Sequence, residues 1–155
     1  MKTALVTGGS RGIGKAVSTV LGKNYHVVVG YVTSEDKAAE VVSEIKESGG
    51  SASSIEVNIS SKESVDKAFA TIEKSYGSVD ILINNAGITK DNILPRMKEE
   101  EWIDVIQTNL TGSFYTSQRA IKQMMKNKWG RIIFISSIVG MSGNQGQANY
   151  AASKA

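Results

Sequence analysis

The sequence predicts an α/β protein built on a doubly wound parallel sheet. Short apolar and β-branched runs alternate with longer helical patterns along the chain, and the runs VDILIN and IIFI are apolar almost throughout. Strand–helix alternation favours a parallel sheet, and continuous apolar runs are typical of strands that are buried on both faces. The length of 155 residues fits one domain, which we place at residues 1–155.

Five strands and four long helices account for this pattern. We expect strands at residues 4–7, 26–31, 52–57, 79–84 and 131–136, and helices at residues 12–21, 35–48, 62–75 and 99–125. The fourth helix is expected to break near residues 109–112.

Local signals support two of these helices. The apolar face of the second helix is formed by Ala38, Val41, Val42 and Ile45. The third helix is preceded by Ser60-x-x-Glu63, which has the spacing of a capping box. We therefore expect Ser60 to cap this helix.

Composition narrows the classes of function. Lys and Arg number 18 and Asp and Glu number 15, and the resulting net charge of +3 is too small to indicate a nucleic-acid partner. The chain has no Cys, which excludes a disulfide framework and a thiolate metal site. No apolar run has the length of a signal-peptide core or a membrane span. We therefore expect a cytoplasmic protein that binds neither nucleic acid nor membrane.

The single histidine argues against two further classes. His26 begins the second predicted strand, so it lies at the end of the sheet away from the carboxyl ends of the strands, and we expect a surface or turn residue. A Ser–His–Asp triad would lack its base, and one His without Cys does not predict a transition-metal site.

The segment after the first strand is rich in glycine. It reads TGGSRGIG over residues 7–14, with Gly8, Gly12 and Gly14 in a G-x-x-x-G-x-G spacing. Glycines permit a tight turn and a close approach of the backbone to a pyrophosphate, and the free N–H groups of the next helix bind anions. The spacing differs from the G-x-G-x-x-G dinucleotide fingerprint, and an ordinary glycine-rich turn is the alternative.

The choice of nucleotide depends on the first two strands. Arg11 lies in the glycine-rich segment and could bind a 2′-phosphate in a bidentate manner. An NAD site requires a carboxylate at the end of the second strand, where this chain has Thr33 and Ser34. We therefore expect NADP, with Glu35 binding the ribose of NAD as the alternative.

The third and fourth strands also end at polar or small residues. Asn58 could hydrogen-bond an adenine edge, or it could serve only in a turn. The NNAG segment, residues 84–87, is small enough for a ribose to pass close to its backbone, and a turn held by Asn side chains is the alternative.

A Ser, a Tyr and a Lys follow the fifth strand. Ser137 and Tyr150 lie near the carboxyl edge of the predicted sheet, and Tyr150 and Lys154 share one face of a helix. An ammonium about 5 Å from a phenolate, at an effective dielectric constant of about 20, stabilises it by about 3 kcal/mol. Tyr150 is thereby suited to proton transfer, and Ser137 could donate a hydrogen bond to a carbonyl oxygen on which charge develops.

Taken together, these motifs resemble those of the short-chain dehydrogenase/reductase family. The family pattern consists of TGxxxGIG, NNAG, an Asn in the long fourth helix, a Ser, and YxxxK. All five occur here in that order, at residues 7–14, residues 84–87, Asn109, Ser137, and Tyr150 with Lys154. The resemblance implies a Rossmann-like domain that binds NADP(H).

The resemblance also implies a role for each matching residue. Tyr150 would be the general acid, Lys154 would bind the nicotinamide ribose, Ser137 would orient the carbonyl of the substrate, and Asn109 would hold a water in a proton relay. Ser137 and Tyr150 would therefore bind substrate, and no metal is expected. The residues expected to bind the cofactor are Gly8, Ser10, Arg11, Gly12, Ile13, Gly14, Thr33, Asn58, Ile59, Asn85, Ala86, Gly87, Tyr150 and Lys154.

Within the family, the closest resemblance is to the subgroup that reduces 3-oxoacyl thioesters on acyl carrier protein in fatty-acid synthesis. The stretches NNAGITKDNILPRMKEEEW, NLTG and GNQGQANYAASKA carry it. It implies an acidic carrier protein as partner and a homotetramer. Candidates for docking the carrier near the mouth of the active site are Lys122, Lys126, Lys128 and Arg131, with a solvated helix face as the alternative.

Two other functions stay open. One is a reductase of the same family that acts on acetoacetyl-CoA or a small ketone, and the other is an inactive nucleotide-binding fragment. Members of the family are longer than 155 residues, so we expect the N-terminal part of a longer reductase that lacks the last strands and helices. We also expect the fifth strand to be an open edge and this chain alone to be inactive.

Overall fold

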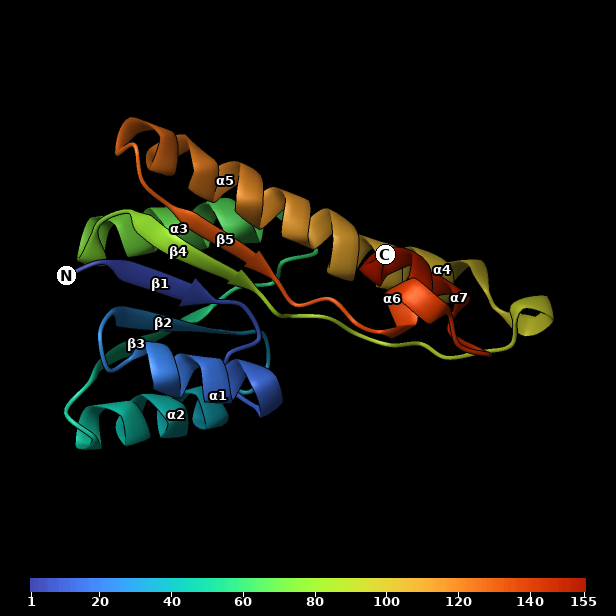
Figure 1. Cartoon of the computed structure of the whole chain (residues 1–155), viewed down its shortest axis with the longest axis horizontal. Helices are drawn as coiled ribbons and strands as arrows, with labels where there is room; N and C mark the ends of the chain where they lie inside the picture. The colour runs from blue at the N-terminus through green and yellow to red at the C-terminus, as the bar shows by residue number, and fades with distance from the viewer.

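The computed structural model describes residues 1–155 and contains one five-stranded sheet (Figure 1). Its strands are β1 (Thr3–Val6), β2 (His26–Tyr31), β3 (Ser51–Glu56), β4 (Val79–Asn84) and β5 (Arg131–Phe134). All neighbours pair in parallel, in the order β3-β2-β1-β4-β5. The predicted fold class is confirmed, and the strand order reverses between β1 and β4, where ligands of such sheets bind.

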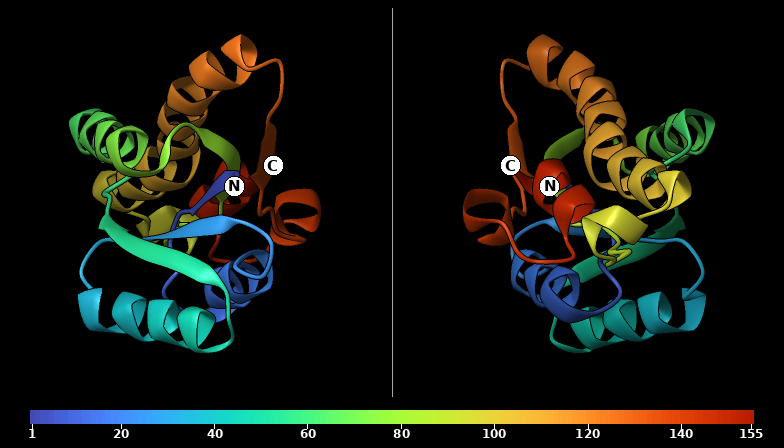
Figure 2. Two further views of the ribbon diagram at one scale, coloured as in Figure 1. Left: turned by 90° about the vertical axis from the view of Figure 1, so that its left-hand side faces the viewer. Right: turned by 90° about the vertical axis from the view of Figure 1, so that its right-hand side faces the viewer.

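Helices cover both faces of the sheet. The long helices are α1 (Gly12–Leu21), α2 (Glu35–Glu47), α3 (Lys62–Tyr76), α4 (Glu99–Ile106) and α5 (Gly112–Lys126). Shorter elements are η1 (Leu94–Arg96), η2 (Gln107–Thr111), α6 (Val139–Ser142) and α7 (Ala148–Lys154). Figure 2 shows α1 and α2 on one face and α3 and α5 on the other. In Figure 1, α4, α6 and α7 lie together beyond the carboxyl ends of the strands.

The two faces of the sheet form two cores. Leu5, Val28 and Leu82 are buried against α3 and α5, and the adjacent strand residues Val6 and Val29 are buried against α1 and α2. Successive side chains of a strand point to opposite faces, so a strand with two covered faces needs apolar residues at every position. This explains the continuous apolar runs in the sequence.

Several predicted details are confirmed and one is wrong. The expected break in the fourth helix is the π-helical turn η2, which separates α4 from α5. The predicted cap of α3 is off by one residue, because the hydroxyl of Ser61 accepts the cap hydrogen bond from the Ser64 N–H, whereas Ser60 donates its hydroxyl to Asn58. Ser34 occupies the N-cap of α2 without a side-chain cap hydrogen bond.

His26 is not the surface or turn residue that we expected. Its ring is partly buried and stacks on Tyr76 with the ring centroids 4.1 Å apart. Nδ1 lies 2.8 Å from the hydroxyl of Ser51 and Nε2 lies 3.0 Å from that of Ser53. Parallel pairing brings these partners together, because His26 is in register with Ser51 and the next residue on the same side of β3 is Ser53.

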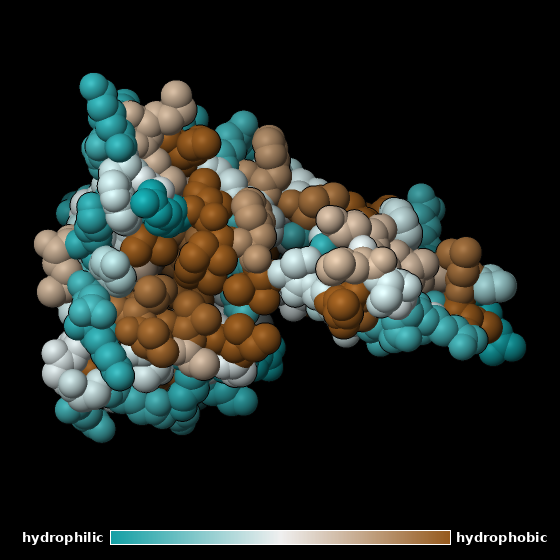
Figure 3. Space-filling model, viewed as in Figure 1, coloured by the Kyte–Doolittle hydropathy of each residue, from teal (hydrophilic) through white to brown (hydrophobic).

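β5 is the outer strand next to β4 and is largely exposed, as expected for an open edge. Ile133 and Phe134 are 47% and 58% exposed. Figure 3 shows hydrophobic residues gathered over the sheet on the face turned toward the viewer. The structure contains no helix that is long and apolar enough to cross a membrane.

Lowering the pH is expected to destabilise the fold through His26. Burial, and then the nearby Lys46, lower the pKa of His26 below its ordinary value of 6.5. The unfolded chain therefore takes up this proton more readily, and the stability present above pH 6.5 is lost as the pH falls through the folded-state pKa. Urea unfolding at neutral pH and near pH 5 measures the loss, and His26→Gln is expected to reduce it. An unchanged pH dependence in His26→Gln would contradict this assignment.

Candidate active site

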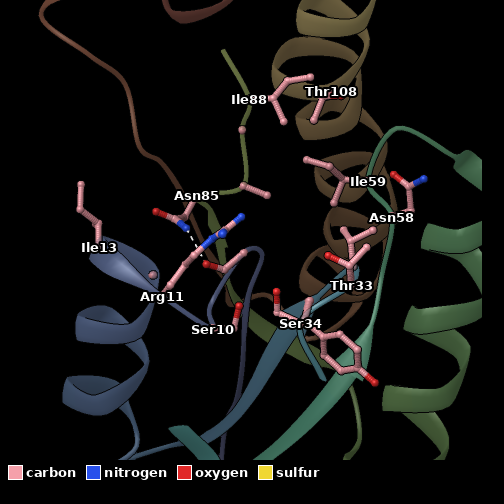
Figure 4. A pocket seen from close by; sticks show the side chains of 16 residues that line it. Ser10, Arg11, Ile13, Thr33, Ser34, Asn58, Ile59, Asn85, Ile88 and Thr108 are labelled. Carbon is pink, nitrogen blue, oxygen red and sulfur yellow. Dashed lines mark hydrogen bonds between the residues drawn. The ribbon is translucent and has the colours of Figure 1, made fainter. Parts of the chain in front are cut away.

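A cavity of about 460 Å³ lies at the carboxyl ends of the strands, where the strand order reverses (Figure 4). Eleven of the residues predicted to bind a cofactor line it: Gly8, Ser10, Arg11, Ile13, Gly14, Thr33, Asn58, Ile59, Asn85, Ala86 and Gly87. Gly12, Tyr150 and Lys154 are not among the lining residues. The parallel sheet thus brings segments from the ends of four strands to one cavity.

Two glycines of the first segment allow close packing beside the cavity. A Cβ on Gly14 would lie 2.2 Å from the carbonyl oxygen of Gly8 and 2.6 Å from Nδ2 of Asn85, so only glycine fits without a shift of the backbone. Gly8 has a φ of +63°, which favours glycine. The backbone of the glycine-rich segment therefore packs directly against the residues that follow β4.

Hydrogen bonds join the segments that follow β1 and β4. The hydroxyl of Thr7 donates to the carbonyl of Ile83 and accepts from the N–H groups of Asn85 and Ala86. In return, Nδ2 of Asn85 donates to the carbonyls of Thr7 and Gly8, both at 3.0 Å. The side chain of Asn85 therefore holds a turn and also lines the cavity, which joins the two alternatives weighed for the NNAG segment.

The start of α1 can accept an anion. Its N-cap residue, Arg11, makes no side-chain cap hydrogen bond, so the first N–H groups of α1 have no side-chain partner. The guanidinium of Arg11 is exposed, forms no salt bridge, and lines the cavity together with Ser10 (Figure 4). A phosphate group fits the chemistry of these donors.

The end of β2 presents hydroxyl groups to the cavity. Thr33 and Ser34 line it, whereas Glu35 does not. Burial, and then the nearby carboxylates of Glu35 and Glu56, raise the pKa of Tyr31 above its ordinary value of 10.0. The Glu35 carboxylate therefore lies beside Tyr31 and does not line the cavity wall.

The end of β3 supplies one apolar and one polar wall. Ile59 is only 3% exposed and still contributes to the lining. Oδ1 of Asn58 accepts hydrogen bonds from the N–H and the hydroxyl of Ser60. Asn58 thus has the turn role that we weighed as an alternative, and it also lines the cavity.

Tyr150 and Lys154 lie on the short helix α7. Nζ of Lys154 is 5.9 Å from the centroid of the Tyr150 ring and donates a 2.7 Å hydrogen bond to the carbonyl of Ile135. A Cβ on Gly87 would lie 3.7 Å from this Nζ, so the amine of Lys154 is close to the cavity wall at Gly87. Burial lowers the pKa of Lys154 below its ordinary value of 10.5.

Asn109 is buried in η2 and contacts α7. Its Oδ1 accepts from the N–H of Ile88, and its Nδ2 donates to the carbonyl of Ile88 and to the hydroxyl of Ser153. The expected helix irregularity at Asn109 is confirmed, and the side chain is bonded to protein groups. Its role in a water relay stays a prediction.

Ser137 precedes the short helix α6, which packs on α7. Its hydroxyl accepts a 3.2 Å hydrogen bond from the N–H of Val139. The neighbouring Ser136 donates its hydroxyl to the carbonyl of Lys154, and a Cβ on Gly140 would lie only 2.6 Å from that carbonyl oxygen. The segment that carries Ser137 is therefore attached to the end of α7.

Some features of the site were not predicted. Tyr31, Val32, Ile88 and Thr108 also line the cavity, and the only signal for them was their position beside predicted residues. Ser34, whose hydroxyl we weighed in the choice of nucleotide, lines it as well. No pattern in the sequence singled out Asn149, which is buried and lies one position before Tyr150.

The four basic residues proposed for docking the carrier lie away from the cavity. The prediction that they lie near the mouth of the site is wrong for a single copy of the chain. Lys122 and Lys126 lie toward the end of α5, and Arg131 begins β5. Asn127, beside Lys126 and Lys128, bonds to Ser78 just before β4. A parallel strand begins at the amino edge of the sheet, so the cluster is at the edge opposite to the cavity.

Comparisons with known proteins agree with this geometry. A family model described as short chain dehydrogenase matches residues 2–155. The chain is 50% identical over 155 residues to a 3-oxoacyl-[acyl-carrier-protein] reductase of Staphylococcus epidermidis, covering 99% of this chain and 64% of that protein. Reductases of the same name from Staphylococcus aureus and Haemophilus influenzae are 49% and 47% identical, with 99% of this chain and 63% and 62% of those proteins covered. The chain thus spans less than two thirds of the length of these relatives.

The titration midpoint of Lys154 in the folded protein is expected to lie below its ordinary pKa of 10.5, because burial disfavours the ammonium form. Reductive ¹³C-methylation of the lysines followed by an NMR pH titration measures this, and Lys154→Arg identifies the signal. Unfolding in urea is expected to return the midpoint to 10.5. A folded-state midpoint at or above that value would contradict the prediction.

Proposed function

Because the chain belongs to the short chain dehydrogenase family, we propose that the protein containing it reduces 3-oxoacyl groups on acyl carrier protein with NADPH. The observation that carries this proposal is the cavity lined by the glycine-rich segment, with the amine of Lys154 close to its wall at Gly87. The relatives that are 47–50% identical to this chain are named as 3-oxoacyl-[acyl-carrier-protein] reductases, which supports the substrate class.

The cavity fits a dinucleotide cofactor. The bare backbone at Gly8 and Gly14 and the uncapped start of α1 suit a pyrophosphate. Arg11 and the hydroxyls of Thr33 and Ser34 suit a 2′-phosphate, and Glu35 lies outside the lining. These features favour NADP(H), and Asn58 and Ile59 would flank the adenine while residues 85–87 would lie beside a ribose.

The chain supplies a proton donor and a hydrogen-bond donor for carbonyl reduction. The bound nicotinamide would supply the hydride to the carbonyl carbon. Tyr150 would donate its phenolic proton to the carbonyl oxygen, and Ser137 would donate a hydrogen bond to that oxygen as negative charge develops. Lys154 would stabilise the phenolate that Tyr150 leaves and hold the nicotinamide ribose, and Asn109 would contribute to proton resupply.

We also propose a homotetramer. Five large apolar side chains on α4, η2 and α5 are between 46% and 72% exposed: Ile103, Leu110, Phe114, Ile121 and Met125. From Leu110 to Met125 they recur at intervals of four and seven residues, the spacing of one face of an α-helix. A contiguous apolar face of this kind supports association between copies.

Turnover of a 3-oxoacyl thioester tests the proposed function. The complete gene product is expected to bind NADPH, followed by nicotinamide fluorescence, and to oxidise it with acetoacetyl-acyl carrier protein. Tyr150→Phe is expected to lower kcat by about 10²- to 10⁴-fold because it removes the general acid. Turnover of acetoacetyl-CoA or a small ketone, but not of the carrier thioester, would favour the related reductase. NADPH binding without any turnover would favour a non-catalytic nucleotide-binding protein.

Replacing Arg11 is expected to change the cofactor preference. Arg11→Ala should weaken NADPH binding by about 10- to 100-fold and leave NADH binding unchanged, since a charged hydrogen bond contributes about 1.5–3 kcal/mol. Fluorescence titrations with both nucleotides measure the effect. Arg96→Ala, an exposed arginine outside the cavity, serves as the control. Equal weakening of both nucleotides would contradict a 2′-phosphate contact.

A further inference from the structure

Each of the two residues proposed for proton transfer follows directly after a buried polar residue. Asn149, before Tyr150, is fully buried, and Ser153, before Lys154, is 8% exposed. We propose that Asn149 is a positioning residue. It holds Tyr150 by joining the first turn of α7 to the segment between β4 and α4. The catalytic part of this proposal rests on the proposed function.

The amide of Asn149 uses all of its hydrogen-bonding groups except one lone pair. Nδ2 donates to the carbonyl of Lys90 at 2.9 Å and to the carbonyl of Glu101 at 3.0 Å. Oδ1 accepts from the N–H of Tyr150 at 2.8 Å. One side chain therefore connects three parts of the fold: the segment after β4, helix α4 and the residue Tyr150 itself.

The bond to the Tyr150 N–H takes the place of a helix cap. The first N–H groups of a helix have no partner within the helix, and a side chain at the N-cap usually satisfies one of them. Gln147 at the N-cap of α7 makes no such bond, because its Oε1 accepts from Nδ2 of Asn144 instead. Asn149 therefore satisfies the amide that an N-cap side chain would otherwise bind.

The two carbonyls that accept from Asn149 are themselves held in place. Nζ of Lys90 forms a 2.5 Å ion pair with Asp104 on α4. Glu101 belongs to α4, and its carboxylate accepts from the N–H of Lys98 and from Nδ2 of Asn92. Asn149 thus anchors Tyr150 to a framework, not to a free loop.

A second tie acts at the other end of α7. The hydroxyl of Ser153 donates to the carbonyl of Tyr150 and accepts from Nδ2 of Asn109, which also binds both backbone groups of Ile88. The segment after β4 is therefore tied to α7 twice, through Asn109 at Ile88 and through Asn149 at Lys90. Loss of Asn149 would leave Tyr150 held from one side only.

Removal of the Asn149 amide would act on the chemical step. Asn149→Ala removes a donor from the carbonyls of Lys90 and Glu101 and leaves the N–H of Tyr150 without its acceptor, and small displacements of a reacting group are costly. We expect kcat of the complete gene product to fall about 10- to 100-fold, with KM for the thioester and the affinity for NADPH changed less than about 3-fold. Asn144→Ala is the matched control, because Asn144 lies in the same segment, is exposed and bonds only to Gln147.

A carboxyl group at this position gives a pH signature that a general loss of stability would not. In Asn149→Asp, an ionised carboxylate would face two carbonyls that need donors, and burial would favour its protonated form, which can donate to one of them. We expect kcat of Asn149→Asp, relative to wild type at the same pH, to rise as the pH falls from about 8 to about 6. The same ratio for Asn149→Ala is expected to stay flat.

Hydrogen exchange provides a readout that needs no substrate. We expect the amide of Tyr150 to exchange at least about 10-fold faster in Asn149→Ala than in wild type or Asn144→Ala. If Asn149→Ala fails to fold, two other measurements take its place. One uses Asn149→Ser, which keeps one hydrogen-bond donor, and the other is the pH response of Asn149→Asp.

Unchanged exchange of the Tyr150 amide together with an unchanged kcat would overturn the proposal, as would equal pH responses of the Asp and Ala variants. If the wild-type protein reduces no 3-oxoacyl thioester, the proposed function fails. The exchange measurement then still decides whether Asn149 holds Tyr150.

Discussion

The junction between the ends of β1 and β4 is the contact on which the site depends. The Thr7 hydroxyl binds the backbone after β4, and the Asn85 amide binds the backbone after β1, so each segment satisfies polar groups of the other. Buried backbone groups without partners are costly, and this reciprocal arrangement leaves little freedom to either segment. Gly14 is required here because any side chain would collide with the Gly8 carbonyl.

The same junction sets the direction of the chain after β4. From Asn85 the chain runs beyond the sheet, and the segment up to α4 has little regular structure of its own (Figure 1). Side-chain amides of Asn109 and Asn149 bind its backbone in place of a strand or helix partner. This segment therefore links the part of the fold that lines the cavity to α7, which carries Tyr150 and Lys154.

Sequence reasoning succeeded where a local pattern decides the structure. The five strands, the break at η2 and the glycine-rich segment were predicted to within a few residues, because periodicity, β-branching and glycine content act over short distances. The resemblance to the short-chain dehydrogenase/reductase family is confirmed by the match over residues 2–155. Sequence reasoning failed for the cap of α3, since Ser60 and Ser61 are both suitable caps and only the residue at which the helix starts distinguishes them.

The sequence alone determined the fold class, the family and the residues at the ends of the strands, because these follow from local periodicity and from motifs of short span. Only the tertiary structure decided what those residues contact. The pairing of His26 with Ser51 and Ser53 requires the register of β2 on β3, and the position of the basic cluster requires the direction of α5. The contacts of Asn149 with Lys90 and Glu101 join residues 59 and 48 positions apart. Such contacts leave no periodic trace in a sequence, because they depend on where packing of the whole sheet brings distant segments together.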